Sequence, residues 1–204
     1  MYKVFFNDRK VFLTDDFQKH FNVKYGLFYK YQNKGELEEL LGFYRNLKKI
    51  DTLYIFHSDI EELRNTFRTC YLNINAAGGL VKNKEGRILI IKRRNRWDLP
   101  KGKSAPEENM QQTAIREVSE ECGISNIEIT KPLLSTYHTY AINDRPVLKR
   151  TTWFEMLYTG SLDPVPQIKE HITEVKWFDK SELGEVIKNT YQLIVDVFRC
   201  ANLI

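Results

Sequence analysis

The stretch Gly102–Ile124 constrains the fold most, because it predicts a single helix with two chemically distinct faces. The pattern predicts a helix near residues 105–121, with Ser104 and Glu107 as a capping box and Pro106 in the first turn. Apolar side chains recur in it with helical periodicity, which predicts that one side packs on a core. These side chains are Met110, Ala114, Ile115, Val118 and Cys122.

Three carboxylates share a second face of this predicted helix. At roughly 100° per residue, Glu117, Glu120 and Glu121 fall beside one another, whereas Glu108 falls on the opposite side if the helix reaches it. Arg116 is the only basic residue of the helix, so interspersed cations do not offset the repulsion. A solvated acidic face is one interpretation. The other is a site for Mg²⁺, which takes oxygen ligands and would neutralise the cluster.

Composition excludes several classes of protein. The chain has 204 residues, 42% hydrophobic and 28% charged, which is typical of globular domains. It has no apolar run of the length of a membrane span and no signal-peptide pattern at its start, so we expect a cytoplasmic protein. A net charge of +4 is too small to indicate nucleic-acid binding by itself. Three cysteines at unrelated spacings favour buried free thiols: Cys70, Cys122 and Cys200.

The pattern changes near residue 71, which predicts a small α+β domain at 1–70 and a larger domain at 71–204. In the first, we expect a hairpin of residues 2–6 and 10–13, strands at 26–31 and 52–56, a helix from Leu37 to Leu47 and a helix capped by Ser58 and Glu61. In the second, besides the acidic helix, we expect strands at 72–81, 87–92, 133–140, 149–158 and 174–178, and one helix from Ser181.

The spacing of residues in Gly102–Ile124 resembles the Nudix box at every fixed position. Gly102, Glu108 and the run Arg116–Ile124 carry the match, and a chance match has a probability on the order of 10⁻⁷ at average residue usage. The resemblance implies a Nudix α/β/α sandwich with a mixed sheet over residues 71–204, preceded by the small α+β domain. It also implies a hydrolase that cleaves a nucleoside diphosphate linked to another group.

The resemblance further implies roles for single residues. Arg116 is expected to orient carboxylates through ion pairs, with Glu108 as one partner. The expected cofactor is Mg²⁺, with Mn²⁺ as a substitute, and it activates the attacking water. The implied metal-binding positions are Gly102, Glu117, Glu120 and Glu121.

The general base stays open at this point. Glu120 and Glu117 are the candidates within the box, and Glu170 is the candidate in the later segment, with Glu174 as its neighbour. Each of the latter two is also explained as an ordinary surface carboxylate.

Substrate residues are predicted on both sides of the box. The cation-rich stretch before the box suits a substrate with several phosphates, or else forms a solvated strand end. Within it, residues 97–103 (WDLPKGK) resemble the lead-in of Nudix enzymes that act on dinucleoside polyphosphates and diphosphoinositol polyphosphates. Arg94 and Lys101 are therefore candidate phosphate contacts, and Tyr140 lies near a tyrosine often found in dinucleoside polyphosphate hydrolases. A packing role for Tyr140 is the alternative.

One departure from close relatives concerns the loop before the box glutamate. Glu107 stands where many of them carry glycine, so we expect the Pro106–Glu107 loop to lack the conformations of glycine.

The favoured function is Mg²⁺-dependent hydrolysis of a dinucleoside polyphosphate or a similar polyphosphorylated substrate. ADP-ribose or a nucleotide sugar is the alternative substrate, and a non-enzymatic nucleotide sensor is the alternative class. The expected partner is a small-molecule nucleotide or polyphosphate, with no membrane, and a homodimer remains open. A decapping enzyme that acts on RNA is a further alternative within the hydrolase class, against which the mild basicity and the lack of a recognisable RNA-binding motif argue.

Overall fold

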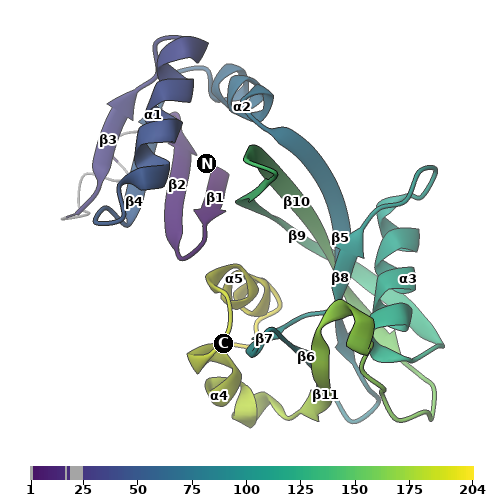
Figure 1. Ribbon diagram of the computed structural model, residues 1–204. Coiled ribbons are helices and arrows are strands. Elements are labelled where there is room, and N and C mark those ends of the chain that lie inside the picture. Colours follow the sequence, from purple (N-terminus) through teal and green to yellow (C-terminus); the bar gives the residue numbers. More distant parts are fainter. Residues whose placement is uncertain (1, 17, 19–24) are drawn as a thin grey trace. The chain divides into compact units, whose positions relative to one another are not determined.

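The computed structural model describes residues 2–16, 18 and 25–204 (Figure 1). Contacts divide the chain into two compact units. The first comprises Met1–Ile74 and Tyr137–Lys149, and the second comprises Asn75–Thr136 and Arg150–Ile204. The first unit thus takes in a later segment in addition to the expected N-terminal domain. No helix in the described ranges is long and apolar enough to cross a membrane.

The first unit contains the hairpin, strands and helices that its sequence predicts. Its elements are β1 (Tyr2–Phe6), β2 (Arg9–Thr14), β3 (Leu27–Lys30), α1 (Lys34–Asn46), β4 (Thr52–Phe56), α2 (Ile60–Thr69) and the tip of the hairpin formed by β9 (Ile127–Ile142) and β10 (Arg145–Tyr158). The strand order is β9–β1–β2–β4–β3, with β1 and β2 antiparallel and the other neighbours parallel. Apolar faces of both helices are buried in the core of this unit, through Leu37, Leu41, Tyr44, Leu63 and Phe67.

Helix α2 begins one residue later than its predicted cap implies. Asp59 is the N-cap, and its carboxylate accepts hydrogen bonds from the backbone N–H groups of Glu61 and Glu62. The predicted capping box of Ser58 and Glu61 is wrong, because the carboxylate of Asp59 occupies those donors.

The second unit is a sheet with helices on both faces. Its elements are β5 (Leu72–Lys82) from Asn75 onward, β6 (Ile88–Arg93), β7 (Arg96–Asp98), β8 (Lys101–Lys103), α3 (Met110–Cys122), the bases of β9 and β10, β11 (Ile172–Phe178), α4 (Leu183–Lys188) and α5 (Gln192–Cys200). The strand order is β11–β6–β5–β10–β9, with β7 paired to β6 and β8 to β5. Figure 1 shows α3 on one face of these strands and α4 and α5 on the other. Residues 88–91 are fully buried, as expected for a strand covered on both faces.

The predicted start of the acidic helix is wrong by about one turn. Helix α3 begins at Met110, and Asn109 and Gln112 form a reciprocal capping box that replaces the expected one of Ser104 and Glu107. Pro106 therefore lies in the loop before the helix. The helix ends at Gly123, whose φ of 65° is a left-handed conformation that suits glycine.

The C-terminal region also differs from its prediction, because two helices replace one. Between α4 and α5, the Thr190 hydroxyl donates to the Trp97 carbonyl at 2.7 Å, and the Trp97 N–H donates to the Asn189 carbonyl at 2.9 Å. The second bond takes the Asn189 carbonyl, a backbone group that a continuous helix would need. Of the three free thiols, only Cys122 is buried as expected. Cys70 is half-buried and Cys200 is exposed.

Candidate metal and substrate site

Helix α3 presents its three box glutamates at graded depths. Glu121 is almost fully buried, with 2% of its surface exposed, and the side chain of Glu117 is 14% exposed. The Glu120 side chain is about half exposed, at 49%. One helix face thus runs from the protein interior to solvent and carries a carboxylate at each depth.

Glu121 is held by the backbone of strand β8. Its Oε2 accepts a hydrogen bond from the Lys101 N–H at 2.9 Å, and its Oε1 lies 3.6 Å from Nη1 of Arg93. Burial raises the pKa of Glu121 to about 7, against the opposing charges of Lys101 and Arg93. A buried carboxylate in such surroundings is stabilised by added positive charge.

Gly102 lies directly against the carboxylate of Glu117. It occupies the middle of β8, where it pairs with Ala77 of β5, and a Cβ atom at this position would overlap the carboxylate of Glu117. Only glycine leaves this space open, so the β8 backbone and the Glu117 carboxylate can approach each other.

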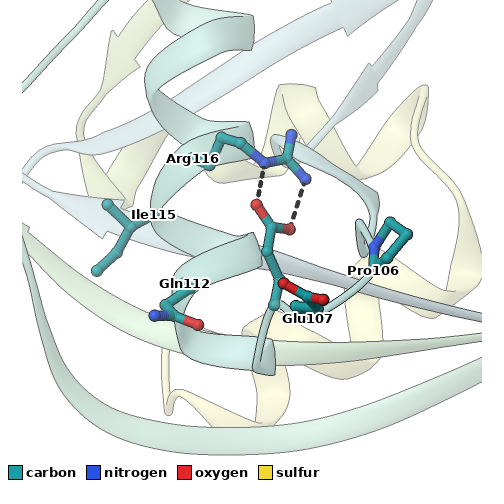
Figure 2. A pocket seen from close by; sticks show the side chains of 6 residues that line it. Pro106, Glu107, Gln112, Ile115 and Arg116 are labelled. Atoms are coloured by element: carbon teal, nitrogen blue, oxygen red, sulfur yellow. Dashed lines mark hydrogen bonds and ion pairs between the residues drawn. The ribbon is translucent and has the colours of Figure 1, made fainter.

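Arg116 links the carboxylates of this helix face to the preceding loop, and Figure 2 shows its side chain next to that loop. Its Nε and Nη2 donate to the two oxygens of Glu108, at 2.6 and 2.9 Å. Its Nη1 donates to Glu117 at 2.8 Å and to Glu120 at 3.1 Å, and Nη2 also reaches the Lys103 carbonyl at 3.0 Å. The resemblance implies ion pairs of Arg116 with carboxylates, including Glu108, whereas the contact with the Lys103 carbonyl was not predicted.

The residues present suit a hard divalent cation by their donor chemistry. Three carboxylates and the Gly102 carbonyl offer oxygen atoms, the donors that such a cation prefers, and the open space at Gly102 lets one carboxylate approach the β8 backbone. Within the described ranges, no three His, Cys, Asp or Glu side chains are grouped so that they could hold a metal ion. The lack of such a group is explained in part by Arg116, whose guanidinium donates hydrogen bonds to Glu117 and Glu120.

Glu170 is joined to the same site by Arg93. It lies in a short 3₁₀ turn (Ile168–Glu170), and its carboxylate pairs with Nη2 of Arg93 at 2.7 Å. The other guanidinium nitrogen of Arg93 faces Glu121. Glu174 lies instead on β11, where it pairs with Lys176 and Lys92. Of the two later carboxylates, the structure therefore brings Glu170 to the box.

The predicted substrate residues fall in three different settings. Lys101 is buried, and its ammonium pairs with Asp98 at 2.5 Å. This placement favours a structural ion pair over the phosphate contact predicted from the sequence. Arg94 is exposed in the turn between β6 and β7, with a φ of 50°. Tyr140 is half-buried, stacks on His138 and belongs to the first unit.

The loop before α3 corrects one expectation. Glu107 has a φ of 70°, so it adopts the left-handed conformation that glycine takes readily. Together with the first turns of α3, this loop borders an open hollow of about 480 Å³ (Figure 2). Its lining residues are Pro106, Glu107, Glu108, Gln112, Ile115 and Arg116.

Two residues of the site were not singled out by sequence reasoning. Arg93 connects Glu170 to Glu121, and Asp98 pairs with Lys101 beside the backbone that holds Glu121. Asp98 carried a signal, because it is the only acidic residue in a stretch of six cations. Arg93 carried none that distinguished it from its basic neighbours.

Comparison with known proteins identifies the family to which this chain belongs. The model of the NUDIX domain matches residues 72–196, which is more than half of the chain. The chain therefore belongs to the Nudix family, and the predictions of family and of enzyme class, a pyrophosphohydrolase, are confirmed.

Similar proteins include two bacterial RNA pyrophosphohydrolases. That of Bartonella tribocorum is 25% identical over 151 residues, covering 60% of this chain and 87% of the relative. That of Erythrobacter litoralis is 26% identical over 164 residues, covering 70% and 95%. Among solved structures, the MutT protein from Methanosarcina mazei Go1 is 25% identical, with a TM-score of 0.42 and coverage of 56% and 83%. The C. elegans Ap4A hydrolase is 19% identical, with a TM-score of 0.47 and coverage of 64% and 97%.

Proposed function

We propose that this protein hydrolyses a pyrophosphate bond of a polyphosphorylated nucleotide, with Mg²⁺ held by Glu117, Glu120 and Glu121. The observation that carries the proposal is the set of three glutamates on one face of α3, next to a glycine whose missing side chain makes room for a carboxylate. Mn²⁺ is the expected substitute metal because it takes similar oxygen ligands.

The bound metal supplies Lewis-acid activation of water and neutralises charge on the phosphate oxygens. The chain supplies the positioning of its own ligands. Glu121 is fixed by the Lys101 N–H, which limits the rotamers of its carboxylate. Arg116 makes two hydrogen bonds to Glu108 that do not involve Glu117 or Glu120, and these bonds anchor its guanidinium at the site.

Glu170 is the proposed acceptor of the proton from the attacking water. Its side chain is about half exposed, at 50%, so solvent water can reach it. Its pairing with Arg93 ties it to the buried Glu121 and thereby to the proposed metal site. Glu120, also half exposed, is the alternative acceptor within the box, and Glu117 is the less accessible one.

The proposed substrate is a dinucleoside polyphosphate such as diadenosine tetraphosphate. The support is the resemblance of residues 97–103 to the lead-in of enzymes with such substrates, together with the cations around them. Several of these cations already pair with carboxylates, whereas the exposed Arg94 follows Arg93 directly and can meet a phosphate from solvent.

A second candidate substrate is the 5′-polyphosphate end of RNA. The observation that favours it is the name of the relatives, since several proteins 25–28% identical to this chain are RNA pyrophosphohydrolases. Hydrolysis of a pyrophosphate bond is the reaction with both candidate substrates. They differ in the part of the substrate, beyond its phosphates, that the protein must bind.

The test is a hydrolysis screen of the full chain with Mg²⁺ and with a chelator, in which the products are separated by ion exchange. The substrates are diadenosine tetraphosphate, ADP-ribose, 5′-triphosphorylated RNA and the common nucleoside triphosphates. We expect Mg²⁺-dependent release of mononucleotides from diadenosine tetraphosphate at the highest kcat/KM. A higher value for the RNA would replace the first candidate by the second, and no turnover of any compound would overturn the proposed function.

A further inference from the structure

The first unit contains a cavity that plays no part in the site described above. Its volume is about 260 Å³. All of its lining residues belong to the first unit, and they are Phe6, Asn7, Arg9, Arg45, Tyr71, Thr139, Tyr140, Ala141 and Pro146. Two of them are arginines and none is acidic, so the lining favours an anion.

Strand pairing and a helix end build this cavity. Strands β1 and β9 pair in parallel, with Phe6 opposite Thr139, which places the following Tyr140 close to the end of β1. Arg9 donates to three carbonyls at the end of α1, those of Tyr44, Arg45 and Leu47, at 2.6, 3.1 and 3.1 Å. The carbonyls at the C-terminal end of α1 carry partial negative charge, which disfavours an anion in the cavity. The hydrogen bonds from Arg9 satisfy these carbonyls and offset that charge.

Arg45 is the cation that remains available. It lies in the last turn of α1, is exposed, and its side chain makes no hydrogen bond or ion pair within the ranges that the structure describes. Burial raises the pKa of Tyr71, and the positive charge of Arg45 opposes that rise. An arginine that is already placed at a cavity can bind a phosphate or a carboxylate through two parallel hydrogen bonds.

Tyr71 gives an independent indication of a ligand. It is 92% buried, since 8% of its surface is exposed, and within the described residues its hydroxyl has no hydrogen-bond partner. A buried hydroxyl without a partner is costly, and a ligand that enters the cavity would supply the missing bond. The aromatic rings of Phe6, Tyr71 and Tyr140 offer apolar surface for a planar ring.

We propose that this cavity of the first unit binds a small planar ring that carries an anionic group, with a nucleoside monophosphate as the representative ligand. Arg45 binds the phosphate, Tyr71 hydrogen-bonds the ligand, and Tyr140 packs on the ring. The proposal is independent of the function proposed above. It gives Tyr140 a binding role in the first unit in place of a contact at the box.

The test is calorimetric titration of the full chain with adenosine 5′-monophosphate, with inorganic phosphate and adenosine as separate probes. A chelator is present, so that metal-dependent binding at the box is suppressed. We expect saturable binding of the monophosphate, tighter than that of either probe. Equal binding of adenosine would contradict the role of Arg45, and no binding of the monophosphate at millimolar concentration would overturn the proposal.

Two variants and matched controls locate the binding. Arg45→Gln should weaken it about tenfold or more, whereas Arg68→Gln, at the exposed end of α2, should leave it unchanged. Tyr71→Phe should weaken it roughly threefold to tenfold without lowering Tm, since it removes a hydroxyl that has no partner among the residues the structure describes. Tyr25→Phe, at an exposed position, is the matched control.

Binding unchanged in both Arg45→Gln and Tyr71→Phe would place the ligand elsewhere and contradict the proposal. A single-stranded oligonucleotide that binds through Arg45 far more tightly than the monophosphate would also contradict it, in favour of a nucleic-acid site.

Discussion

Glu108 receives two hydrogen bonds from the guanidinium of Arg116, one on each carboxylate oxygen (Figure 2). The hydrogen bonds from Arg116, followed by one from the Ala105 N–H, lower the pKa of Glu108 to about 2. The same guanidinium reaches Glu117 and Glu120. Glu108, which lies before the helix, therefore anchors Arg116, and Arg116 positions the two proposed ligands Glu117 and Glu120.

Glu108→Gln should destabilise the protein in a pH-dependent manner. The folded-state pKa of about 2 lies below the ordinary 4.5, so the contribution of this carboxylate is fully present above about pH 4.5 and is lost as the pH falls through 2. Urea unfolding at several pH values measures it. The difference between wild type and variant should shrink from about pH 5 to about pH 3, and a constant difference would contradict the role of the ion pair.

Gly102→Ala should lower Mg²⁺-dependent kcat/KM by about tenfold or more while the fold persists. The added Cβ would displace the Glu117 carboxylate, which is the end of a flexible side chain and can move. Gly184→Ala is the matched control, because a Cβ there meets open space in α4. The readouts are steady-state kinetics and Tm. Activity of Gly102→Ala equal to that of the control would show that Glu117 does not need its position against β8.

Lys101→Met should destabilise the fold by about 3–5 kcal/mol, because it leaves the carboxylate of Asp98 buried and unpaired. The double variant Asp98→Asn, Lys101→Met should recover part of that loss. Chemical denaturation measures both. If Lys101 served only as a phosphate contact, the single variant would keep its stability and show a raised KM instead.

Glu170→Gln should lower kcat by about 10²–10⁴-fold, while the affinity for Mg²⁺ is kept. Glu174→Gln is the matched control, since Glu174 pairs with Lys92 of β6 and Lys176 of β11. A Glu170→Gln enzyme within about twofold of wild type would move the proton acceptor to Glu120 or Glu117.

Local patterns predicted much of this molecule. Most of the apolar stripe of α3, the three glutamates beside it and most strands follow from short-range periodicity. Ile115, which the pattern assigns to the core-facing stripe, is instead exposed. The predicted helix start was wrong because the sequence offers two capping boxes, Ser104 with Glu107 and Asn109 with Gln112. The structure contains the second box, and Glu108 before it pairs with Arg116. Both possibilities are compatible with the sequence alone.

Contacts between distant residues were beyond such patterns. Arg93 and Glu170 are 77 residues apart, and Lys101 and Glu121 are 20 apart. Periodicity states which face of an element is buried, but not which side chain of another element meets it. The pairing of β1 with the tip of β9 is of the same kind, and it built a cavity that no motif indicated.

The central claim is that the glutamates of α3 hold the metal on which hydrolysis depends. The most direct test measures the rate of diadenosine tetraphosphate hydrolysis as a function of Mg²⁺ concentration for the wild type, Glu120→Gln and Glu121→Gln, with Tm as the control for folding. We predict that each variant loses at least roughly two orders of magnitude in Mg²⁺-dependent turnover and remains folded. Unchanged turnover in both variants would contradict the claim.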